Sequence, residues 1–310
     1  MFIEKPNELP KMMLPPLPEV YQIEIVSSCN LKCIMCPTQF FQRKNKQKFI
    51  EIDLIKKIVD EGDLDASYFV ELQMAGEPTL HPKMKEIIKL IKSTGVNVGL
   101  STNGTHIKNQ TEALLELNSI TISLDSITHY DEIRTGGKIE NLLTDMIEFI
   151  PKALEKGIII DIQIIELEGW ETQLDYIKIL FDKYDVNIRS NPNCYFPYFY
   201  PEKYTLPVSN ELCINPWFSV SIQANGNVTS CCFSMGDDVI FGNLNDNSLR
   251  EIWLNDEVKK LQDEHQTRQY RPICSKCYMR SPCLFHWDMY LSGIKNRYKG
   301  NKYVNHISSN

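Results

Sequence analysis

A chain of 310 residues with 43% apolar residues can bury a large core, as one α/β domain or as two smaller ones. Its 40 acidic residues outnumber 33 basic ones, and no long Lys/Arg run is present, so nucleic-acid binding is not supported. No signal-like segment and no apolar run of about 18 residues is found, so we expect no membrane partner. We therefore expect a cytoplasmic protein, in which ten cysteines indicate metal ligation more than disulfides.

Strand-like and helix-like segments alternate from residue 20 to residue 193. The predicted strands are residues 20–28, 68–76, 96–104, 119–126, 158–165 and 186–191. The predicted helices are residues 52–62, 82–95, 111–118, 139–157 and 171–185. Strands that are apolar at most positions are typical of a parallel sheet covered by helices. Six such units fit either an open doubly wound sheet or a complete or partial barrel, with ligands at the carboxyl ends of the strands.

Three cysteines follow the first predicted strand within "SSCNLKCIMCPT" (27–38). Cys29, Cys33 and Cys36 read C-x3-C-x2-C. A structural zinc site needs four ligands, and the next cysteine along the chain is 158 residues away. The count instead fits a [4Fe–4S] cluster held at three irons, whose fourth iron is open to a chelating small molecule.

This motif, at the end of the first strand of a β/α array, resembles that of the radical S-adenosylmethionine (SAM) enzymes. The resemblance implies a partial (β/α)6 TIM-like barrel over residues 20–193. It implies that the open iron binds the amino and carboxylate groups of SAM. Reductive cleavage of SAM then gives a 5′-deoxyadenosyl radical, which abstracts hydrogen from an unactivated C–H bond. An electron donor such as flavodoxin or ferredoxin is implied as a partner.

Other strand ends resemble the SAM-binding stretches of that family. "MAGEP" (74–78) resembles the element at the SAM amino group, and "STNG" (101–104) and "SLD" (123–125) resemble stretches near the ribose and methionine parts. "YDEIR" (130–134) resembles the segment whose arginine meets the SAM carboxylate, and Met35 stands where an aromatic residue usually lies near adenine. The SAM contacts implied by the resemblance are Met35, Gly76, Glu77, Pro78, Ser101, Asn103, Ser123, Asp125 and Arg134.

Seven further cysteines lie between residues 194 and 283. "CINPWFSVSIQANGNVTSCC" (213–232) predicts a β-hairpin around Asn225-Gly226, and a helix is predicted at 248–265, before "CSKC" (274–277). Opposed cysteine pairs of this kind fit a zinc ribbon. The pattern C-x12-G-x4-C, followed by C-x2-C-x5-C, also resembles the SPASM or twitch domains, which hold auxiliary iron–sulfur clusters.

This second resemblance implies one auxiliary [4Fe–4S] cluster, in addition to the SAM-binding one. Trp287 stands where the fuller SPASM form continues with cysteine, so two ligands for a further cluster are missing. The expected auxiliary ligands are Cys213, Cys231, Cys274 and Cys277, with Cys283 as a substitute. The predicted division is an N-terminal extension (1–19), a core barrel (20–193), a linker (194–212), an auxiliary-cluster domain (213–290) of a hairpin plus helix, and a tail (291–310).

Three thiols remain outside these ligand sets. If Cys231 binds a cluster, Cys232 should face away from it, because side chains alternate along a strand. Cys194 ends the sixth predicted strand on the rim that carries the active site. It is the first candidate for a thiol that returns a hydrogen atom to a substrate radical, followed by Cys232 and Cys283.

The leading hypothesis is a radical SAM oxidoreductase or epimerase that acts on a small polar molecule such as a sugar or aminocyclitol. Only about twenty residues precede the first strand, which we interpret as too few for the peptide-binding domain of many peptide-modifying relatives. The alternatives are radical epimerisation or cross-linking of a ribosomal peptide or protein, and a methyl or thio-group transferase. A non-enzymatic zinc or iron–sulfur protein is the alternative from another class.

Overall fold

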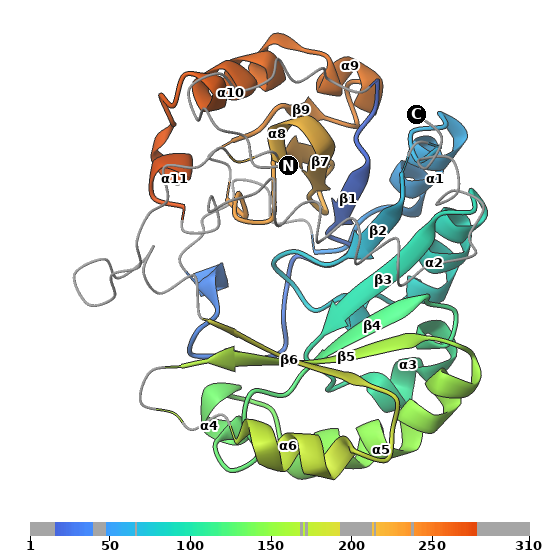
Figure 1. Cartoon of the computed structure of the whole chain (residues 1–310). Coiled ribbons are helices and arrows are strands. Elements are labelled where there is room, and N and C mark those ends of the chain that lie inside the picture. Colours follow the sequence, from blue (N-terminus) through green and yellow to red (C-terminus); the bar gives the residue numbers. More distant parts are fainter. Residues whose placement is uncertain are drawn as a thin grey trace, which may run out of the picture.

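The computed structural model describes residues 16–39, 48–65, 67–167, 170, 173–192, 213, 215–236 and 239–277. Their strands form one sheet in the order β6-β5-β4-β3-β2-β1-β7-β8-β9 (Figure 1). Strands β1 to β6 are parallel, β7 pairs in parallel with β1, and β8 and β9 are antiparallel additions. The predicted α/β fold with a mainly parallel sheet is confirmed.

The core strands are β1 (Val20–Ile23), β2 (Phe69–Leu72), β3 (Asn97–Thr102), β4 (Ser119–Ser123), β5 (Ile159–Glu166) and β6 (Asn187–Pro192). The helices between them are α1 (Ile52–Asp60), α2 (Met84–Lys92), α3 (Ile107–Leu114), α5 (Ile139–Glu155) and α6 (Leu174–Phe181). Short helices that the sequence did not indicate follow β1, β2 and β4: η1 (Pro37–Gln39), η2 (Pro78–Leu80) and α4 (Tyr130–Ile133).

The strand order distinguishes the two folds that the sequence left open. A doubly wound sheet reverses its strand order at a switch point, whereas β1 to β6 follow one another without reversal. Because crossovers between parallel strands are right-handed, winding in one direction puts the helices on one face. Figure 1 shows α1, α2, α3 and α5 along this outer face. The core therefore has the winding of a partial barrel.

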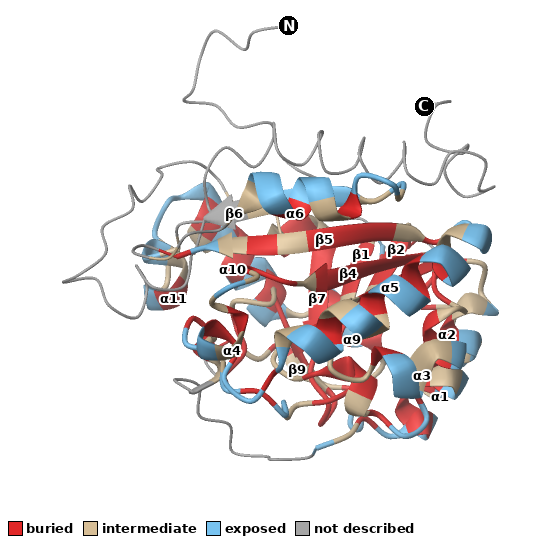
Figure 2. Ribbon diagram, turned by 90° about the horizontal axis from the view of Figure 1, so that it is seen from below, coloured by how far each residue is buried: buried red, intermediate tan, exposed pale blue. Residues whose placement is uncertain are grey.

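The sheet has an apolar face and a polar face. Alternate strand residues such as Val70, Leu100 and Ile122 are at most 1% exposed and pack under the helices. Helix α2 shows the matching pattern, since Met84, Ile87, Ile88 and Ile91 recur at helical spacing and are all fully buried. Figure 2 shows buried strands beneath helices whose outer sides are exposed. The strand residues between these apolar ones point to the opposite face, which no helix of the core covers (Figure 1).

The C-terminal elements extend the same sheet. They are α8 (Asn215–Phe218), β7 (Ser219–Ile222), β8 (Asn227–Thr229), β9 (Gly242–Asn243), α9 (Leu249–Trp253), α10 (Asp256–Gln266) and α11 (Pro272–Ser275). The expected hairpin is present as β7 and β8, around the turn at Asn225 and Gly226. All four residues of β7 pair with β1, so the hairpin continues the barrel sheet directly.

Three local expectations are wrong. The helix predicted at 248–265 is two helices, because the Asn255 side chain accepts a hydrogen bond from the backbone N–H of Val258 (3.1 Å) and starts α10. The helix predicted at 111–118 runs from Ile107 to Leu114. Strand β8 ends at Thr229, so Cys231 and Cys232 lie in the following turn and strand alternation says nothing about Cys232.

Within the part of the chain that the structure describes, no helix is both long and apolar enough to cross a lipid bilayer.

Candidate functional site

The first cysteine motif lies on the loop that leaves β1. Cys29 is exposed, and Cys33 and Cys36 are half-buried. Backbone hydrogen bonds fix the loop against the end of α4 and the residues just after it, from Lys32 N to Thr135 O and from Ile34 N to Ile133 O, each 2.9 Å. The motif is therefore held at the carboxyl end of the sheet, where the sequence predicts a ligand site.

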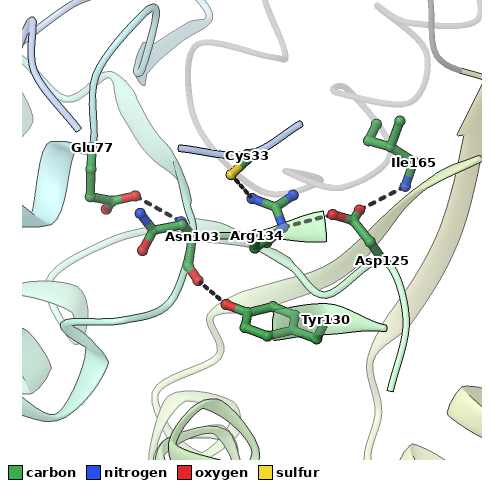
Figure 3. Close-up of polar contacts among 7 residues, drawn as sticks. All are labelled: Cys33, Glu77, Asn103, Asp125, Tyr130, Arg134 and Ile165. Carbon is green, nitrogen blue, oxygen red and sulfur yellow. Dashed lines mark hydrogen bonds and ion pairs between the residues drawn. The ribbon is translucent and has the colours of Figure 1, made fainter. Parts of the chain in front are cut away.

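Groups that can donate a hydrogen bond lie next to all three sulfurs, and Thr38 Oγ1 lies 3.1 Å from Cys36 Sγ. The backbone N–H of Leu31 lies 3.4 Å from Cys29 Sγ, and Asn103 Nδ2 lies 3.5 Å from the same sulfur. Arg134 Nη1 lies 3.8 Å from Cys33 Sγ (Figure 3). Donors of this kind stabilise sulfur that carries negative charge, and hydrogen bonds to cluster sulfurs tune reduction potential.

Burial favours the protonated form of two of these thiols, Cys29 and Cys33. Burial raises the pKa of Cys29, and burial raises the pKa of Cys33 to about 11 although the Arg134 guanidinium opposes this shift. Metal ligation replaces these protons. Among the described residues, no three Cys, His, Asp or Glu side chains converge on a single-ion site. In a [4Fe–4S] cluster each cysteine binds a different iron, so three sulfurs on one loop with donors facing them fit that group.

Glu77, a predicted SAM contact, lies after β2 and is 2% exposed. Its Oε1 accepts hydrogen bonds from Thr79 N (3.1 Å), Thr79 Oγ1 (2.6 Å) and Thr102 Oγ1 (2.6 Å). Its Oε2 accepts one from Asn103 N at 2.7 Å (Figure 3). The carboxylate thus ties η2 to the end of β3, and its contact with the SAM ammonium stays a prediction.

Asp125 and Arg134 form a buried ion pair. Arg134 Nε lies 2.6 Å from Asp125 Oδ2, and the two side chains are 9% and 0% exposed. Asp125 has a left-handed backbone (φ 61°), and its Oδ1 accepts a hydrogen bond from Ile165 N at 2.8 Å. Figure 3 shows the guanidinium between Asp125 and Cys33. The pair therefore links the ends of β4 and β5 to the cysteine loop.

Three other predicted SAM contacts lie around this loop. A Cβ on Gly76 would overlap the carbonyl of Val26 and the amide of Ser28, so only glycine lets the two backbones approach. Pro78 is the first residue of η2. Met35 is 7% exposed and packs in a small apolar cluster with Ile133 and Leu167.

Two predicted contacts have their partners on neighbouring strands of the sheet. Ser101 Oγ donates a hydrogen bond to Glu71 Oε1 on β2 (2.9 Å), and Ser123 pairs in register with Gln163 of β5. The structure thus brings Cys29, Cys33, Glu77, Asn103, Asp125 and Arg134 into contacts around one loop. It places Ser101 and Ser123 on the polar face of the sheet. Sequence reasoning missed Asn30, whose Oδ1 accepts a hydrogen bond from Asn103 Nδ2 at 3.0 Å.

Three of the expected auxiliary ligands lie near one another. Burial, together with the nearby Cys231 and Cys277 sulfurs, raises the pKa of Cys274 to about 12. All three are half-buried, as is Cys213, and the N–H of Cys277 donates to Cys274 O at 3.2 Å. Thiols that come together from distant segments in this way fit an iron–sulfur cluster, in which each sulfur binds a different iron. Cys194 and Cys283 lie outside the described residues.

Glu24 is a second residue that sequence reasoning missed. It is 1% exposed and follows β1 directly. The signal was present, because a lone charge within the apolar run "YQIEIV" is costly to bury unless it is hydrogen-bonded.

Comparison with known families defines two domains in this chain. Residues 23–166 match the radical SAM superfamily, and residues 213–278 match SPASM, an iron-sulfur cluster-binding domain. The chain therefore carries a radical SAM domain followed by a SPASM domain, as its cysteine motifs predict. These domains imply SAM and two [4Fe–4S] clusters as cofactors, which the residues described above fit.

Similar curated proteins match over part of this chain. A tungsten-containing aldehyde ferredoxin oxidoreductase cofactor-modifying protein of Pyrococcus furiosus is 37% identical over 107 residues, covering 33% of this chain and 28% of that protein. A GTP 3',8-cyclase of Sulfurovum sp. is 25% identical over 230 residues, covering 66% of this chain and 68% of that protein. In three of the curated relatives, the segment that matches this chain spans between about a quarter and a half of the relative's own length.

Similar solved structures share the fold at low identity. BtrN in complex with AdoMet and 2-DOIA has a TM-score of 0.58 at 16% identity, covering 84% of this chain and 93% of BtrN. Streptococcus suis SuiB bound to precursor peptide SuiA has a TM-score of 0.59 at 16% identity, covering 96% of this chain and 74% of SuiB. anSMEcpe with bound AdoMet has a TM-score of 0.54 at 16% identity, covering 84% of this chain and 88% of anSMEcpe.

Proposed function

We propose that this protein is a radical SAM oxidoreductase or epimerase that abstracts hydrogen from an unactivated C–H bond of a small polar molecule, such as a sugar or aminocyclitol. When bound, the cluster and SAM supply the electron and the hydrogen-abstracting radical. Cys29, Cys33 and Cys36 hold the SAM-binding cluster. The remaining predicted SAM contacts position SAM, and the auxiliary cluster lies on Cys213, Cys231, Cys274 and Cys277. An electron donor such as flavodoxin or ferredoxin completes the system.

The polar face of the sheet, which lies opposite the face covered by the helices, carries the proposal of a polar substrate. Register places hydrogen-bonding side chains next to one another across this face, namely Gln22, Glu71, Ser101, Thr121, Asp161, Gln163, Arg189 and Ser221. Neighbours on the face bond to each other, as Arg189 Nη2 does to Asp161 Oδ2 at 2.9 Å. Gln22, Glu71, Ser101 and Gln163 are only partly buried. A face that offers donors and acceptors favours a substrate rich in hydroxyl or amino groups.

A ribosomal peptide or protein is the second candidate substrate. It is favoured by the similarity to SuiB, which was solved with its precursor peptide. The structural match to SuiB covers 96% of this chain. BtrN, which was solved with 2-DOIA, supports the small molecule to a similar degree. The two candidates are therefore separated by experiment.

The first experiment tests the reaction class on anaerobically purified protein. The protein should be brown and contain about eight irons per chain, since each [4Fe–4S] cluster contributes four. With dithionite and SAM it should form 5′-deoxyadenosine. The triple variant C29A/C33A/C36A should lose about four irons and all SAM cleavage, because the other cysteines occupy a separate group. Colourless, zinc-loaded protein, or SAM cleavage that persists in the triple variant, would overturn the proposal.

The second experiment identifies the substrate and the outcome. Mass spectrometry of a reaction with dithionite, SAM and fractionated host extract should reveal a small polar molecule that loses two mass units or exchanges one hydrogen with solvent. A modified peptide would select the second candidate. Single alanine variants of Cys194, Cys232 and Cys283 then separate the two outcomes. In an epimerase, one variant should cleave SAM without forming the epimer and without losing iron, whereas full product formation in all three favours oxidation.

A further inference from the structure

The carboxylate of Glu24 bridges two segments that are far apart in the sequence. Its Oε1 accepts a hydrogen bond from the backbone N–H of Ala75 (3.1 Å), and its Oε2 accepts one from the backbone N–H of Ala224 (3.1 Å). Its own backbone N–H donates to Ile222 O at 2.8 Å. Glu24 is 1% exposed, so each carboxylate oxygen takes a donor from a different domain in a region that excludes water.

On the radical SAM side, Glu24 holds the base of the cysteine loop. Ala75 precedes Gly76, whose backbone packs directly on Val26 and Ser28. The N–H of Glu77 donates to Ser28 O at 3.0 Å, and Ser28 is the residue before the first cysteine of the motif. The hydrogen bond to Ala75 therefore sets the position of the segment on which the motif begins.

On the SPASM side, the bridge continues to the loop that carries Cys231. Ala224 is preceded by Gln223, which is also 1% exposed and whose Nε2 donates to Gly236 O at 2.9 Å. The same loop is closed by a hydrogen bond from Ser234 N to Cys231 O at 3.0 Å. Two neighbouring buried side chains, Glu24 and Gln223, thus connect the two cysteine loops.

We propose that Glu24 is a positioning residue that, together with Gln223, sets the placement of the SAM-binding cluster loop relative to the auxiliary-cluster loop. The proposal rests on the two clusters that the domains imply. A buried carboxylate is retained only when its oxygens are hydrogen-bonded, and charge-assisted hydrogen bonds to N–H groups are among the stronger ones. Removing this acceptor leaves two backbone N–H groups in competition for other partners, and the two loops lose their common support.

The decisive variant is Glu24→Gln, which keeps the size of the side chain. Neither orientation of the amide satisfies both N–H groups, because the NH2 group then faces either Ala75 or Ala224. The matched control is Ser221→Ala. It removes the hydrogen bond from Ser221 Oγ to Gln22 Oε1 (2.9 Å), which joins β1 and β7 but contacts neither cysteine loop.

The readouts are the magnetic coupling between the two reduced clusters, measured by electron paramagnetic resonance, and the dissociation constant of SAM. Iron content reports whether both clusters are loaded. At unchanged iron, Glu24→Gln should alter the coupling and weaken SAM binding about tenfold, whereas Ser221→Ala should change neither. Gln223→Leu should alter the coupling but leave SAM affinity within about twofold, since the bond to Ala75 remains.

Coupling and SAM affinity equal to the control in Glu24→Gln would overturn the proposal. If Glu24→Gln does not take up iron, Gln223→Leu decides the question. An altered coupling in fully loaded Gln223→Leu supports the bridge, and wild-type coupling there overturns it.

Discussion

Replacing Glu77 should destabilise the protein, whatever its effect on SAM. Glu77→Ala removes an acceptor of four hydrogen bonds from a side chain that is 2% exposed. The two hydroxyl donors can turn to other acceptors, but the backbone N–H groups of Thr79 and Asn103 cannot. Each buried donor left unpaired costs about 1–3 kcal/mol, so the loss of both should lower the free energy of unfolding by about 2–6 kcal/mol. Glu77→Gln leaves one of these N–H groups facing an NH2 group and should cost about 1–3 kcal/mol.

Anaerobic thermal unfolding measures this effect. At about 2 °C per kcal/mol, the melting temperature of Glu77→Ala should fall by at least roughly 4 °C. Glu112→Gln is the matched control. The Glu112 side chain is 87% exposed, and the change removes its ion pair with Lys85 at 2.9 Å. Ion pairs on the surface contribute little to stability, because water and salt screen them. SAM titration at a temperature where each variant is folded then reports the predicted contact with the SAM ammonium separately.

Melting temperatures of both Glu77 variants equal to that of Glu112→Gln would refute this reasoning. The carboxylate would then not hold η2 to the end of β3. A loss of SAM affinity without a loss of stability would instead show that Glu77 acts on SAM alone.

The other predictions concern Asp63, Arg134 and Gly76. Burial raises the pKa of Asp63 to about 6, so its folded state keeps the proton that the unfolded state releases near pH 4, and folding stability falls as pH rises to about 6. Asp63→Asn should therefore raise the melting temperature more at pH 8 than at pH 5, and equal shifts would contradict the assignment. Arg134→Ala leaves the fully buried Asp125 carboxylate unpaired and should lower the free energy of unfolding in denaturant by about 3–5 kcal/mol, with an unchanged midpoint speaking against the ion pair. Gly76→Ala forces the backbone of Val26 to move and should lower iron at the SAM-binding cluster while auxiliary iron stays, a result that normal iron content in both would rule out.

Local sequence patterns were sufficient to predict the helices and strands of the core and the kind of site that the cysteines form. Helix and strand periodicities, and the glycines that end helices, depend on neighbours within a few residues, so the predicted strands agree with β1 to β6 apart from their ends. The two cysteine motifs are also local in spacing, and both match the domains found by comparison. The break between α9 and α10 was equally readable, since Asn255 before two acidic residues is a helix start signal.

The sequence alone thus determined the six strands β1 to β6 with the helices between them, the cysteine ligand candidates, and the presence of a radical SAM and a SPASM domain. Only the tertiary structure decided that the strands wind without reversal, that β7 joins β1, and that Asp125 pairs with Arg134 beside Cys33. It also showed that Glu24 contacts Ala224, 200 residues further along the chain. The physical reason is that periodicity and capping act between near neighbours in the chain. Which strand edges pair and which buried charges meet depends instead on how distant segments pack around a shared core.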